Sequence, residues 1–350
     1  MKSGAATLRE IHSQPEVWSR CLDTLDNLDL ENLVDGKGPL THEWIFVGCG
    51  TSYYLSQAAA ATFTSLTGAP ARAVPASEIL LFPKLVFPGG EAAYFPVLIS
   101  RSGHTSEVLR VAEFLKVRGV EFMAVTCDGN ELTERSTRTL KLPVTEESTV
   151  MTSSFTSMLL AMQYVAARVA RQDEFVTALH SLPASLAKLF SIYVPKIEEL
   201  AQRSFDDVAF LGQGPFYPIA SETALKVMES SSSYAQFFPT LEFRHGPMSI
   251  VSNKVLVGAM LSESGYAEES AVLLEMKSLG GSTLAIANQL SPEIKSSADL
   301  SIELALAVPE FARLGVYVVW GQLLGCCLGL RKGLNPDAPR HLSRVVTLLN

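Results

Sequence analysis

Short apolar runs alternate along this chain with longer stretches in which apolar residues recur at helical spacing. Because the runs are apolar throughout rather than alternately polar, they are typical of strands covered on both faces. The predicted strands are Trp44–Val47, Arg72–Val74, Val97–Ser100, Phe122–Thr126, Thr139–Leu142, Val208–Leu211, Val255–Met260, Thr283–Ala287 and Leu300–Leu304. The predicted helices are 7–35, 52–66, 105–118, 152–170, 218–231, 266–279 and 309–330, with a helical bridge at 172–204. This alternation predicts parallel sheets with crossover helices.

Two blocks of sequence occur twice. Trp44–Tyr53 returns as Val208–Tyr217 after 164 residues, and Ser100–Glu107 returns as Ser262–Glu269 after 162 residues. Two separate blocks at nearly one offset indicate a duplicated unit of about 160 residues. Only the first copy keeps a dense group of hydroxyl side chains beside its glycines.

The duplication predicts a division of the chain into five segments. They are an N-terminal helical segment (1–40), a first domain (41–171), a helical bridge (172–204), a second domain (205–332) and a tail (333–350). The tail is rich in turn residues and ends in an apolar, strand-like stretch.

Composition agrees with two globular domains and excludes several classes. The chain has 350 residues, 47% of them hydrophobic, and a net charge of −8, which disfavours a nucleic-acid partner. Its five cysteines show no metal-ligand spacing, so we expect a reducing cytoplasm, no disulfide framework and no metal. No signal peptide is recognisable at Met1. The uncharged stretch Leu314–Leu330 is short for a bilayer, so we expect a buried helix and no membrane partner.

Two glycine- and hydroxyl-rich loops stand where a predicted strand gives way to a helix. They are Gly48-Cys-Gly-Thr-Ser52 and Ser100-Arg-Ser-Gly-His-Thr105. Unpaired backbone N–H groups and the helix dipole attract anions at such places. Ordinary N-cap turns are the alternative for either loop alone, but two such loops together predict a phosphate site. A Walker loop and a dinucleotide fingerprint are disfavoured, because the lysine of the first and the third glycine of the second are absent.

A second group of residues is suited to moving protons. Glu222, Lys226 and Glu229 follow at i, i+4 and i+7, which puts them on one face of a predicted helix. A solvated salt-bridge stripe is the alternative, but the rest of this helix is apolar, so we expect at least one carboxylate to be buried and suited to general-base work. His245 lies in a Gly-Pro loop, where a structural and a ligand-binding role are both open.

These motifs together resemble the double sugar-isomerase (SIS) domain family. The resemblance rests on the two loops, on Met151-Thr-Ser-Ser-Phe155, on Ala224-Leu-Lys-Val-Met-Glu229, on Arg244-His-Gly-Pro247, on Glu10–Pro15 and on Asn335–Val346. The family includes the isomerase half of glucosamine-6-phosphate synthase. The motifs are most similar to its catabolic branch, the galactosamine-6-phosphate deaminase and tagatose-6-phosphate ketose/aldose isomerase-like proteins.

The resemblance implies a role for each matching residue. Glu229 falls at the base that moves a proton between carbon 1 and carbon 2, and Glu222 at a supporting carboxylate. His245 falls at the ring-opening histidine, which often completes the site of the neighbouring subunit in a dimer. The residues implied in binding phosphate or sugar are Cys49, Gly50, Thr51, Ser52, Ser100, Arg101, Ser102, Thr105, Thr152 and Arg344.

Three departures from the family pattern bear on the reaction. No glutaminase domain precedes the isomerase-like helix after Met1, which favours deamination or plain isomerisation over aminotransfer. Arg344 stands where the synthase has a Schiff-base lysine, and a guanidinium stays protonated and does not form that imine. Arg101 and His104 replace an amide and a carboxylate, which changes the charge that meets the sugar.

The sequence therefore predicts a cytoplasmic homodimeric enzyme of two tandem flavodoxin-like α/β subdomains, each a parallel sheet flanked by helices. We expect it to act on an amino-sugar or ketose 6-phosphate through an enediol or enolamine, without a metal or an organic cofactor. A fructosamine-6-phosphate-type deglycase is an alternative with similar chemistry. A non-catalytic sugar-phosphate sensor is the other, although no basic DNA-recognition helix is evident.

Overall fold

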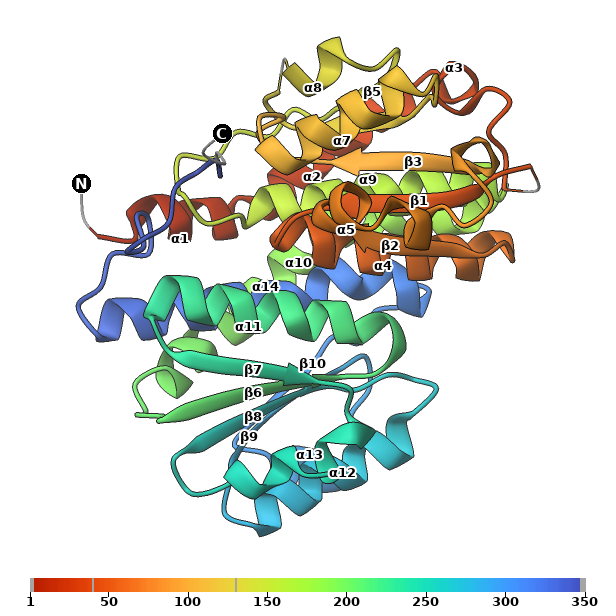
Figure 1. The fold of residues 1–350 in the computed structure, drawn as a ribbon. Coiled ribbons are helices and arrows are strands. Elements are labelled where there is room, and N and C mark those ends of the chain that lie inside the picture. Colours follow the sequence, from red (N-terminus) through yellow and green to blue (C-terminus); the bar gives the residue numbers. More distant parts are fainter. Residues whose placement is uncertain (1–2, 40, 130, 347–350) are drawn as a thin grey trace. The chain divides into compact units, whose positions relative to one another are not determined.

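The chain folds into two compact units, each built on one parallel sheet (Figure 1). The computed structural model describes residues 3–39, 41–129 and 131–346. What we call the first-sheet unit is the described part of Glu16–Glu146, Ser153–His180 and Ser343–Asn350. The second-sheet unit is the described part of Met1–Pro15, Glu147–Thr152 and Ser181–Leu342. Both units join segments that are distant in the sequence, and the five linear segments expected above remain a proposal.

The first sheet has the strand order β2-β1-β3-β4-β5, and every pair of neighbours is parallel. Its strands are β1 (Glu43–Gly48), β2 (Ala71–Pro75), β3 (Tyr94–Ile99), β4 (Met123–Thr126) and β5 (Arg138–Lys141). Its helices are α2 (Gln14–Asp26), α3 (Leu30–Val34), α4 (Thr51–Thr67), α5 (Ala76–Leu81), α6 (Pro83–Val86), the 3-10 turn η1 (Glu91–Ala93), α7 (Ser106–Val117), α8 (Glu131–Glu134) and α9 (Ser153–Val169). Helix α2 belongs to this unit from Glu16 onward.

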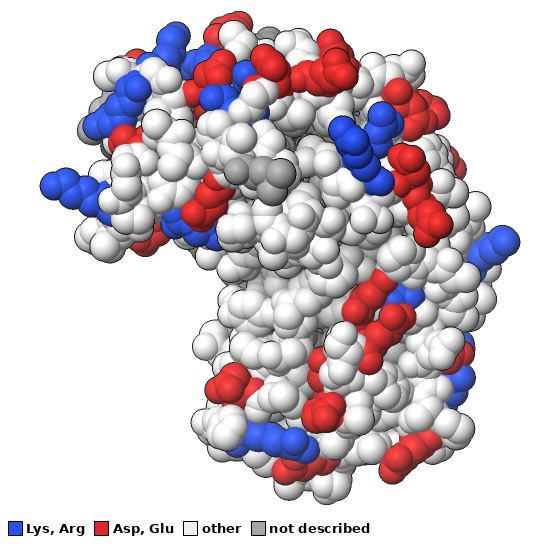
Figure 2. Space-filling model, turned by 90° about the vertical axis from the view of Figure 1, so that its right-hand side faces the viewer, with Lys and Arg blue, Asp and Glu red and all other residues white. Residues whose placement is uncertain are grey.

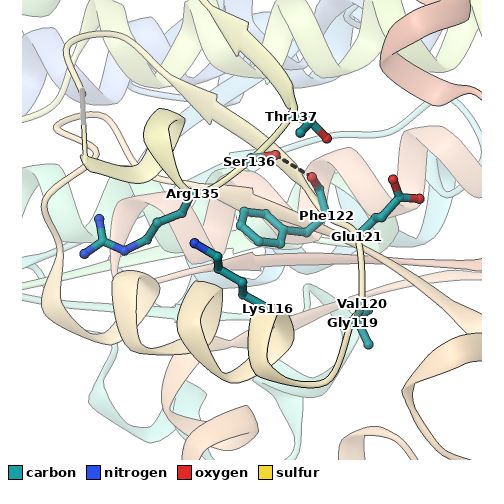
Figure 3. Close-up of a pocket in the computed structure, with 8 residues that line it drawn as sticks. All are labelled: Lys116, Gly119, Val120, Glu121, Phe122, Arg135, Ser136 and Thr137. Atoms are coloured by element: carbon teal, nitrogen blue, oxygen red, sulfur yellow. Dashed lines mark hydrogen bonds between the residues drawn. The ribbon is translucent and has the colours of Figure 1, made fainter.

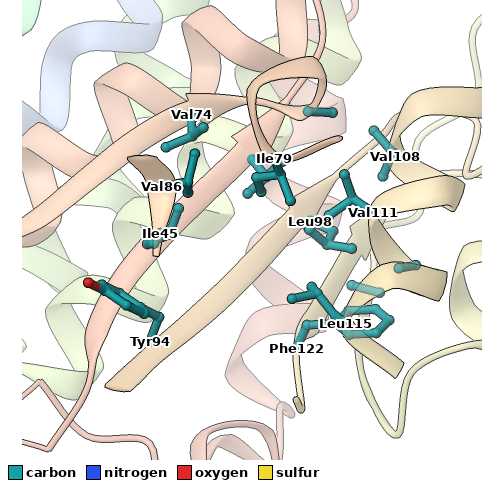
Figure 4. Close-up of a cluster of buried hydrophobic side chains, with 14 of the residues drawn as sticks. Ile45, Val74, Ile79, Val86, Tyr94, Leu98, Val108, Val111, Leu115 and Phe122 are labelled. Carbon is teal, nitrogen blue, oxygen red and sulfur yellow. The ribbon is translucent and has the colours of Figure 1, made fainter. Parts of the chain in front are cut away.

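The two faces of this sheet carry different helices because side chains alternate along a strand. Ile45 and Val47 of β1 face the apolar cluster that includes Val111 of α7 (Figure 4). Trp44, which precedes Ile45, faces α4, where its ring stacks on that of Phe63 with 4.5 Å between centroids. Both faces are thus buried, which explains the unbroken apolar runs in the sequence.

The second sheet repeats this topology with the order β10-β9-β8-β6-β7, also parallel throughout. Its strands are β6 (Asp207–Gly212), β7 (Tyr234–Phe238), β8 (Val255–Met260), β9 (Ser282–Ala287) and β10 (Leu300–Glu303). Its helices are α1 (Ala5–His12), α10 (Asp173–Leu200), α11 (Tyr217–Ser231), α12 (Tyr266–Ser278), α13 (Pro292–Ser297) and α14 (Leu314–Arg331). Helix α10 belongs to this unit from Ser181 onward. Its 3-10 turns are η2 (Gly214–Phe216), η3 (Leu241–Arg244), η4 (Pro247–Ile250) and η5 (Glu310–Arg313). Replacing β1–β5 by β6–β10 converts one strand order into the other, so the duplication seen in the sequence is a duplication of the fold.

Helix α14 lies in the interior of the second-sheet unit against α11. By length and composition, Asp173–Leu200 and Glu310–Arg331 would each suffice to cross a membrane, but the apolar window of the second is 89% buried inside the protein. That burial confirms the expected core helix. Close packing on α11 depends on glycine, since a Cβ on Gly325 would lie 2.8 Å from the carbonyl oxygen of Lys226.

The structure differs from the sequence expectation in three places. The single helix expected over residues 7–35 is three helices, and α3 begins where Asp29 accepts a hydrogen bond from the N–H of Asn32 (3.1 Å). Strand β7 was not expected, because this edge strand is only partly covered and its first residue, Tyr234, is 65% exposed. The described part of the tail forms no strand, so the strand expected there is wrong for residues up to 346.

Substituting Gly325 by alanine is expected to destabilise the second-sheet unit, since the new methyl group would press on α11 backbone. Overpacking of this kind costs about 1–3 kcal/mol. Thermal unfolding followed by circular dichroism would detect the loss. The matched control is Gly89→Ala, because nothing lies within 4 Å of a Cβ at Gly89. Equal melting temperatures for the two variants would show that α14 and α11 are not tightly packed.

Candidate active site

The two expected phosphate loops follow neighbouring strands of the first sheet. One connects β1 to α4 and the other connects β3 to α7. Helices α4 and α7 cover opposite faces, so the strand order reverses direction between β1 and β3. In open parallel sheets, ligands bind at the carboxyl ends of the strands beside such a switch point. The fold therefore brings both loops to the place where this architecture binds ligands.

The β1 loop leads into α4 through a tight glycine turn without a side-chain cap. No side chain of the described residues caps this helix at Gly50, which has a positive φ of 53°. Gly48 permits the tight turn, because a Cβ there would lie 2.5 Å from the carbonyl oxygen of Ser52. Thr51 and Ser52 are 6% and 5% exposed, so any ligand of theirs is largely removed from water. The N–H groups of Ser52 and Tyr53 donate to carbonyls of the same turn (3.1 and 2.8 Å), so we expect the hydroxyls at this helix start to meet an oxyanion.

The β3 loop is held in shape by its own hydroxyls. The hydroxyl oxygens of Ser100 and Thr105 lie 3.0 Å apart, and Ser100 also accepts a hydrogen bond from the N–H of Gly103 (3.2 Å). Ser102 accepts one from the N–H of His104 (3.1 Å). Among the described residues, no side chain caps α7 at Thr105 either. The loop thus presents three ordered hydroxyls.

Cys49 lies in the β1 loop as a thiol rather than a thiolate. Burial, reinforced by the charge of Glu107, raises the pKa of Cys49 to about 12 although the N–H of Ala76 lowers it. A protonated thiol is a poor nucleophile. Its expected part in sugar binding remains a prediction, as a contact and not as a reactive group.

Arg101 is committed to a buried ion pair. Its guanidinium, 5% exposed, lies 3.0 Å from the carboxylate of Glu146, which is 1% exposed. Glu146 also accepts hydrogen bonds from the hydroxyl of Ser153 (3.0 Å) and from the N–H of Ser154 (2.8 Å). The structure thus gives Arg101 a positioning role, tying the β3 loop to the start of α9, and its expected contact with the sugar remains a prediction.

The tail reaches the β3 loop within the first-sheet unit. Arg344 pairs with Asp128 at 2.8 Å, and its carbonyl accepts a hydrogen bond from Arg101 (3.2 Å). The carbonyl of Val346 accepts one from the N–H of Ser106, at the start of α7 (3.3 Å). Arg344 is therefore brought to the loops with which the sequence grouped it. Thr152 belongs to the second-sheet unit, where its carbonyl accepts a hydrogen bond from Gln322 (3.1 Å).

The acid–base residues line up along α11 in the second-sheet unit. The side chains of Glu222 and Lys226 are 0% and 1% exposed, whereas that of Glu229 is 19% exposed. The Lys226 ammonium lies 3.4 Å from Glu222 and also bonds Glu229. Burial lowers the pKa of Lys226, but the two carboxylates outweigh it and hold that pKa above its ordinary value. The expectation that a carboxylate is buried is confirmed, and the solvated stripe is excluded.

Lys226 is the residue that sequence reasoning left out of the site. The sequence spacing already showed that Lys226 lies between two glutamates on one helical face. Only its burial shows that its positive charge compensates their negative charges. Glu229 opens onto a small cavity of about 30 Å³ in this unit, lined also by Ser232, Asn335 and Arg340. That volume holds a water molecule.

His245 follows η3 in an exposed turn. Its N–H donates to the carbonyl of Glu242 (3.0 Å), and its ring forms no hydrogen bond with the described residues. The imidazole is thus available to a ligand or another subunit. The structure does not join His245 to Glu229 by a hydrogen bond, although both belong to the second-sheet unit.

A larger pocket lies elsewhere in the first-sheet unit (Figure 3). It has about 310 Å³ and is lined by Lys116, Arg135 and residues 119–122 and 136–137. These segments precede β4 and β5, so the pocket lies at the amino ends of the strands. The phosphate loops follow the carboxyl ends, and this pocket is therefore not part of the candidate site.

Comparison with known proteins gives one family. The family model described as the SIS domain matches residues 41–168 and 203–318. A curated relative is the glutamine–fructose-6-phosphate aminotransferase of Pseudomonas putida, 28% identical over 97% of this chain and 58% of the relative. The chain thus spans about 58% of the length of that relative.

Solved structures match over almost the entire chain. Glucosamine-6-phosphate deaminase of Thermotoga maritima is 28% identical, with a TM-score of 0.81 over 98% of this chain and 100% of that one. Tagatose-6-phosphate ketose/aldose isomerase of Escherichia coli has a TM-score of 0.83 over 95% of each chain, at 23% identity. The second likeness shows the fold, which is the predicted pair of tandem α/β subdomains.

Removing the charge of Glu146 should destabilise the first-sheet unit. In Glu146→Gln, Arg101 keeps a buried charge without its counterion, which costs about 3–5 kcal/mol. Urea unfolding followed by the fluorescence of Trp18 and Trp44, both in this unit, measures the change. The neighbouring Glu147→Gln is the control, because the pair of Glu147 with Arg9 is 62% and 52% exposed and contributes about 0–1 kcal/mol. A Glu146→Gln variant as stable as the control would contradict the assigned role of the pair.

Proposed function

Because this chain belongs to the SIS-domain family, we propose that it is a phosphosugar isomerase of the aminosugar-6-phosphate deaminase type. The substrate would be an amino-sugar or ketose 6-phosphate, and the protein a cytoplasmic homodimer. The observation that carries the proposal is the charge stripe on α11, in which two buried groups support the partly exposed Glu229. Such a carboxylate has the access and the surroundings that a general base needs.

In this proposal the hydroxyls of the β1 and β3 loops bind the 6-phosphate. Support comes from the lack of a side-chain cap on α4 among the described residues, from the buried Ser52, and from three hydroxyls that hydrogen bonds within the β3 loop hold in place, those of Ser100, Ser102 and Thr105. Holding the phosphate fixes the orientation of the sugar, and orientation supplies a large part of the acceleration of such a reaction. Because Arg101 is neutralised by Glu146, hydroxyls and backbone N–H groups would carry the binding.

Glu229 then moves the proton. Its carboxylate removes the proton from carbon 2 of the amino sugar, which gives an enolamine, and returns it to carbon 1. The resulting imine at carbon 2 is hydrolysed by one water molecule to the ketose 6-phosphate and ammonia. Lys226, whose pKa is held above its ordinary value, lies against Glu229 as its counterion, and Glu222 balances Lys226 when Glu229 becomes protonated. With an aldose that lacks the amine, the same transfer is an aldose–ketose isomerisation.

The solved deaminase supports the amine-releasing version, since the likeness extends over all of that chain. The tail supports it as well. Arg344 is tied to Asp128 and keeps its charge, so an imine would come from the amine of the substrate. A sensor that binds DNA is not favoured by the face in Figure 2, where the described lysines and arginines are interspersed with acidic residues and form no continuous basic surface.

The decisive assay measures ammonia and ketose 6-phosphate from glucosamine 6-phosphate, galactosamine 6-phosphate and a fructoselysine-type 6-phosphate. We expect ammonia together with a ketose phosphate from one amino sugar. Glu229→Gln should lower kcat by about 10²–10⁴-fold while sugar-phosphate binding is kept, because the base is lost but not the phosphate site. Glu293→Gln, an exposed glutamate on α13, is the control and should keep full activity.

Other results of this assay decide against the proposal. Release of an amino acid without ammonia would identify a deglycase. Binding of every sugar without turnover would favour the sensor. Loss of binding together with activity in Glu229→Gln would overturn the role of Glu229 as a base.

We also propose that His245 acts in the site of the other subunit of the dimer. Its exposed ring, which has no hydrogen-bond partner among the described residues, supports this role. Mixing two inactive variants, Glu229→Gln and His245→Asn, then gives heterodimers with one complete site each. We expect recovery of about a quarter of wild-type activity after random subunit exchange. No recovery, although exchange is verified, would mean that Glu229 and His245 act within one chain.

A further inference from the structure

The second-sheet unit contains a second copy of the β3 loop. Ser262-Glu-Ser-Gly-Tyr-Ala-Glu-Glu269 connects β8 to α12, and β8 has the same place in its sheet as β3 has in the first. The frame of the loop is retained. The N–H of Gly265 donates to the hydroxyl of Ser262 (2.9 Å), as the N–H of Gly103 does to Ser100 (3.2 Å).

The two copies differ in what occupies the loop. In the first copy the Ser100 hydroxyl faces Thr105 at 3.0 Å. In the second copy the threonine is replaced by Ala267. Both copies have a glutamate at the same repeat position, Glu107 and Glu269, but the buried Oε2 of Glu107 has no hydrogen-bond partner among the described residues, whereas the carboxylate of Glu269 enters the loop. One of its oxygens accepts a hydrogen bond from the N–H of Ser262 (2.6 Å) and the other accepts one from the Ser262 hydroxyl (2.7 Å).

The carboxylate fits closely. Glu269 is 1% exposed, and a Cβ on Gly265 would lie 2.6 Å from one of its oxygens, so it rests directly on the loop backbone. Its position in the first turn of α12 places negative charge where the helix dipole favours it. The hydroxyl of Ser270, the next residue of α12, is 7% exposed and has no hydrogen-bond partner among the described residues.

The electrostatic surroundings set the cost of this arrangement. Burial raises the pKa of Glu269, the two hydrogen bonds from Ser262 lower it, and the charges of Glu310 and Glu268 raise it. Glu263, another carboxylate of the loop, is paired with the buried Arg313. The loop therefore holds one carboxylate against burial and against like charges nearby.

We propose that Glu269 is a built-in substitute for a bound oxyanion, which closes the second loop and limits each chain to one phosphate. A carboxylate and a phosphate present the same kind of acceptor oxygens to an N–H and a hydroxyl. Removing the carboxylate should therefore open a phosphate site in the second-sheet unit. The assignment of the one bound phosphate to the first-sheet unit rests on the function proposed above. The closure of the second loop by Glu269 does not depend on that function.

The test is phosphate binding by Glu269→Ala, with inorganic phosphate as the probe. Because Ser102→Ala should weaken the first site, the informative comparison is between that variant and the double variant Ser102→Ala/Glu269→Ala. At pH 8, we expect phosphate to raise the melting temperature of the double variant by about 2 °C more than that of Ser102→Ala. Equilibrium dialysis should show two phosphates per chain for Glu269→Ala and one for the wild type.

Two controls separate the carboxylate from its neighbourhood. Glu269→Gln keeps the loop filled and should gain no phosphate site. Glu268→Ala removes one exposed negative charge beside the loop and should also gain none.

A folded double variant whose melting temperature responds to phosphate no more than that of Ser102→Ala would overturn the proposal. The proposal expects phosphate to bind where the carboxylate was and so to stabilise a variant that lacks it. If neither Glu269→Ala nor Glu269→Ser folds in concentrated phosphate, the proposal is overturned as well. If Ser102→Ala binds phosphate like the wild type, the role of the first loops fails, while the comparison at Glu269 still stands.

Discussion

Buried charges that are matched within their own unit determine where the functional loops of this protein stand. Arg101 is held by Glu146 beneath the β3 loop, and Lys226 is held by Glu222 and Glu229 on α11. A buried ion pair adds little net stability, but an unmatched buried charge costs several kcal/mol. The side chains of Arg101 and Lys226 are therefore each restricted to the position next to their counterions. That restriction also fixes the neighbouring hydroxyls and carboxylates in place.

The same constraint separates the parts of the site that the sequence could predict from those it could not. The location of the two loops that we expect to bind phosphate followed from strand–helix alternation, because parallel strands present their carboxyl ends at one edge of a sheet. The direction of the Arg101 side chain did not follow. An arginine beside two serines fits a phosphate contact equally well until Glu146, 45 residues later, is found against its guanidinium. Contacts at such separation leave no local periodicity.

Predictability of the fold shows a similar division. Strands covered on both faces, such as β1 and β8, are apolar runs that the sequence displays openly. Strand β7 lies at the sheet edge with mixed exposure, and its pattern resembled a loop. Likewise, the N-terminal apolar periodicity was read correctly as helical, but the break at Ser13 was missed although Pro15, in the first turn of α2, marks a helix start. Elements were visible where burial was uniform and were missed where it was partial.

The two copies of the fold differ in chemistry because side chains of the second copy occupy its own loops. In the β6 loop, Phe216 stands at the repeat position of Ser52, and its buried ring packs on Tyr317 with 4.7 Å between centroids. In the β8 loop, Glu269 accepts hydrogen bonds from the N–H and the hydroxyl of Ser262, whereas in the first copy the Ser100 N–H donates to a strand carbonyl and its hydroxyl faces Thr105. The ring of Phe216 and the carboxylate of Glu269 have the same effect. Each leaves fewer hydrogen-bond donors for an anion, and neither changes the sheet. Because strand order and loop frame are retained, the change needed only side chains, and α11 of the same copy was left to carry the buried acid–base groups.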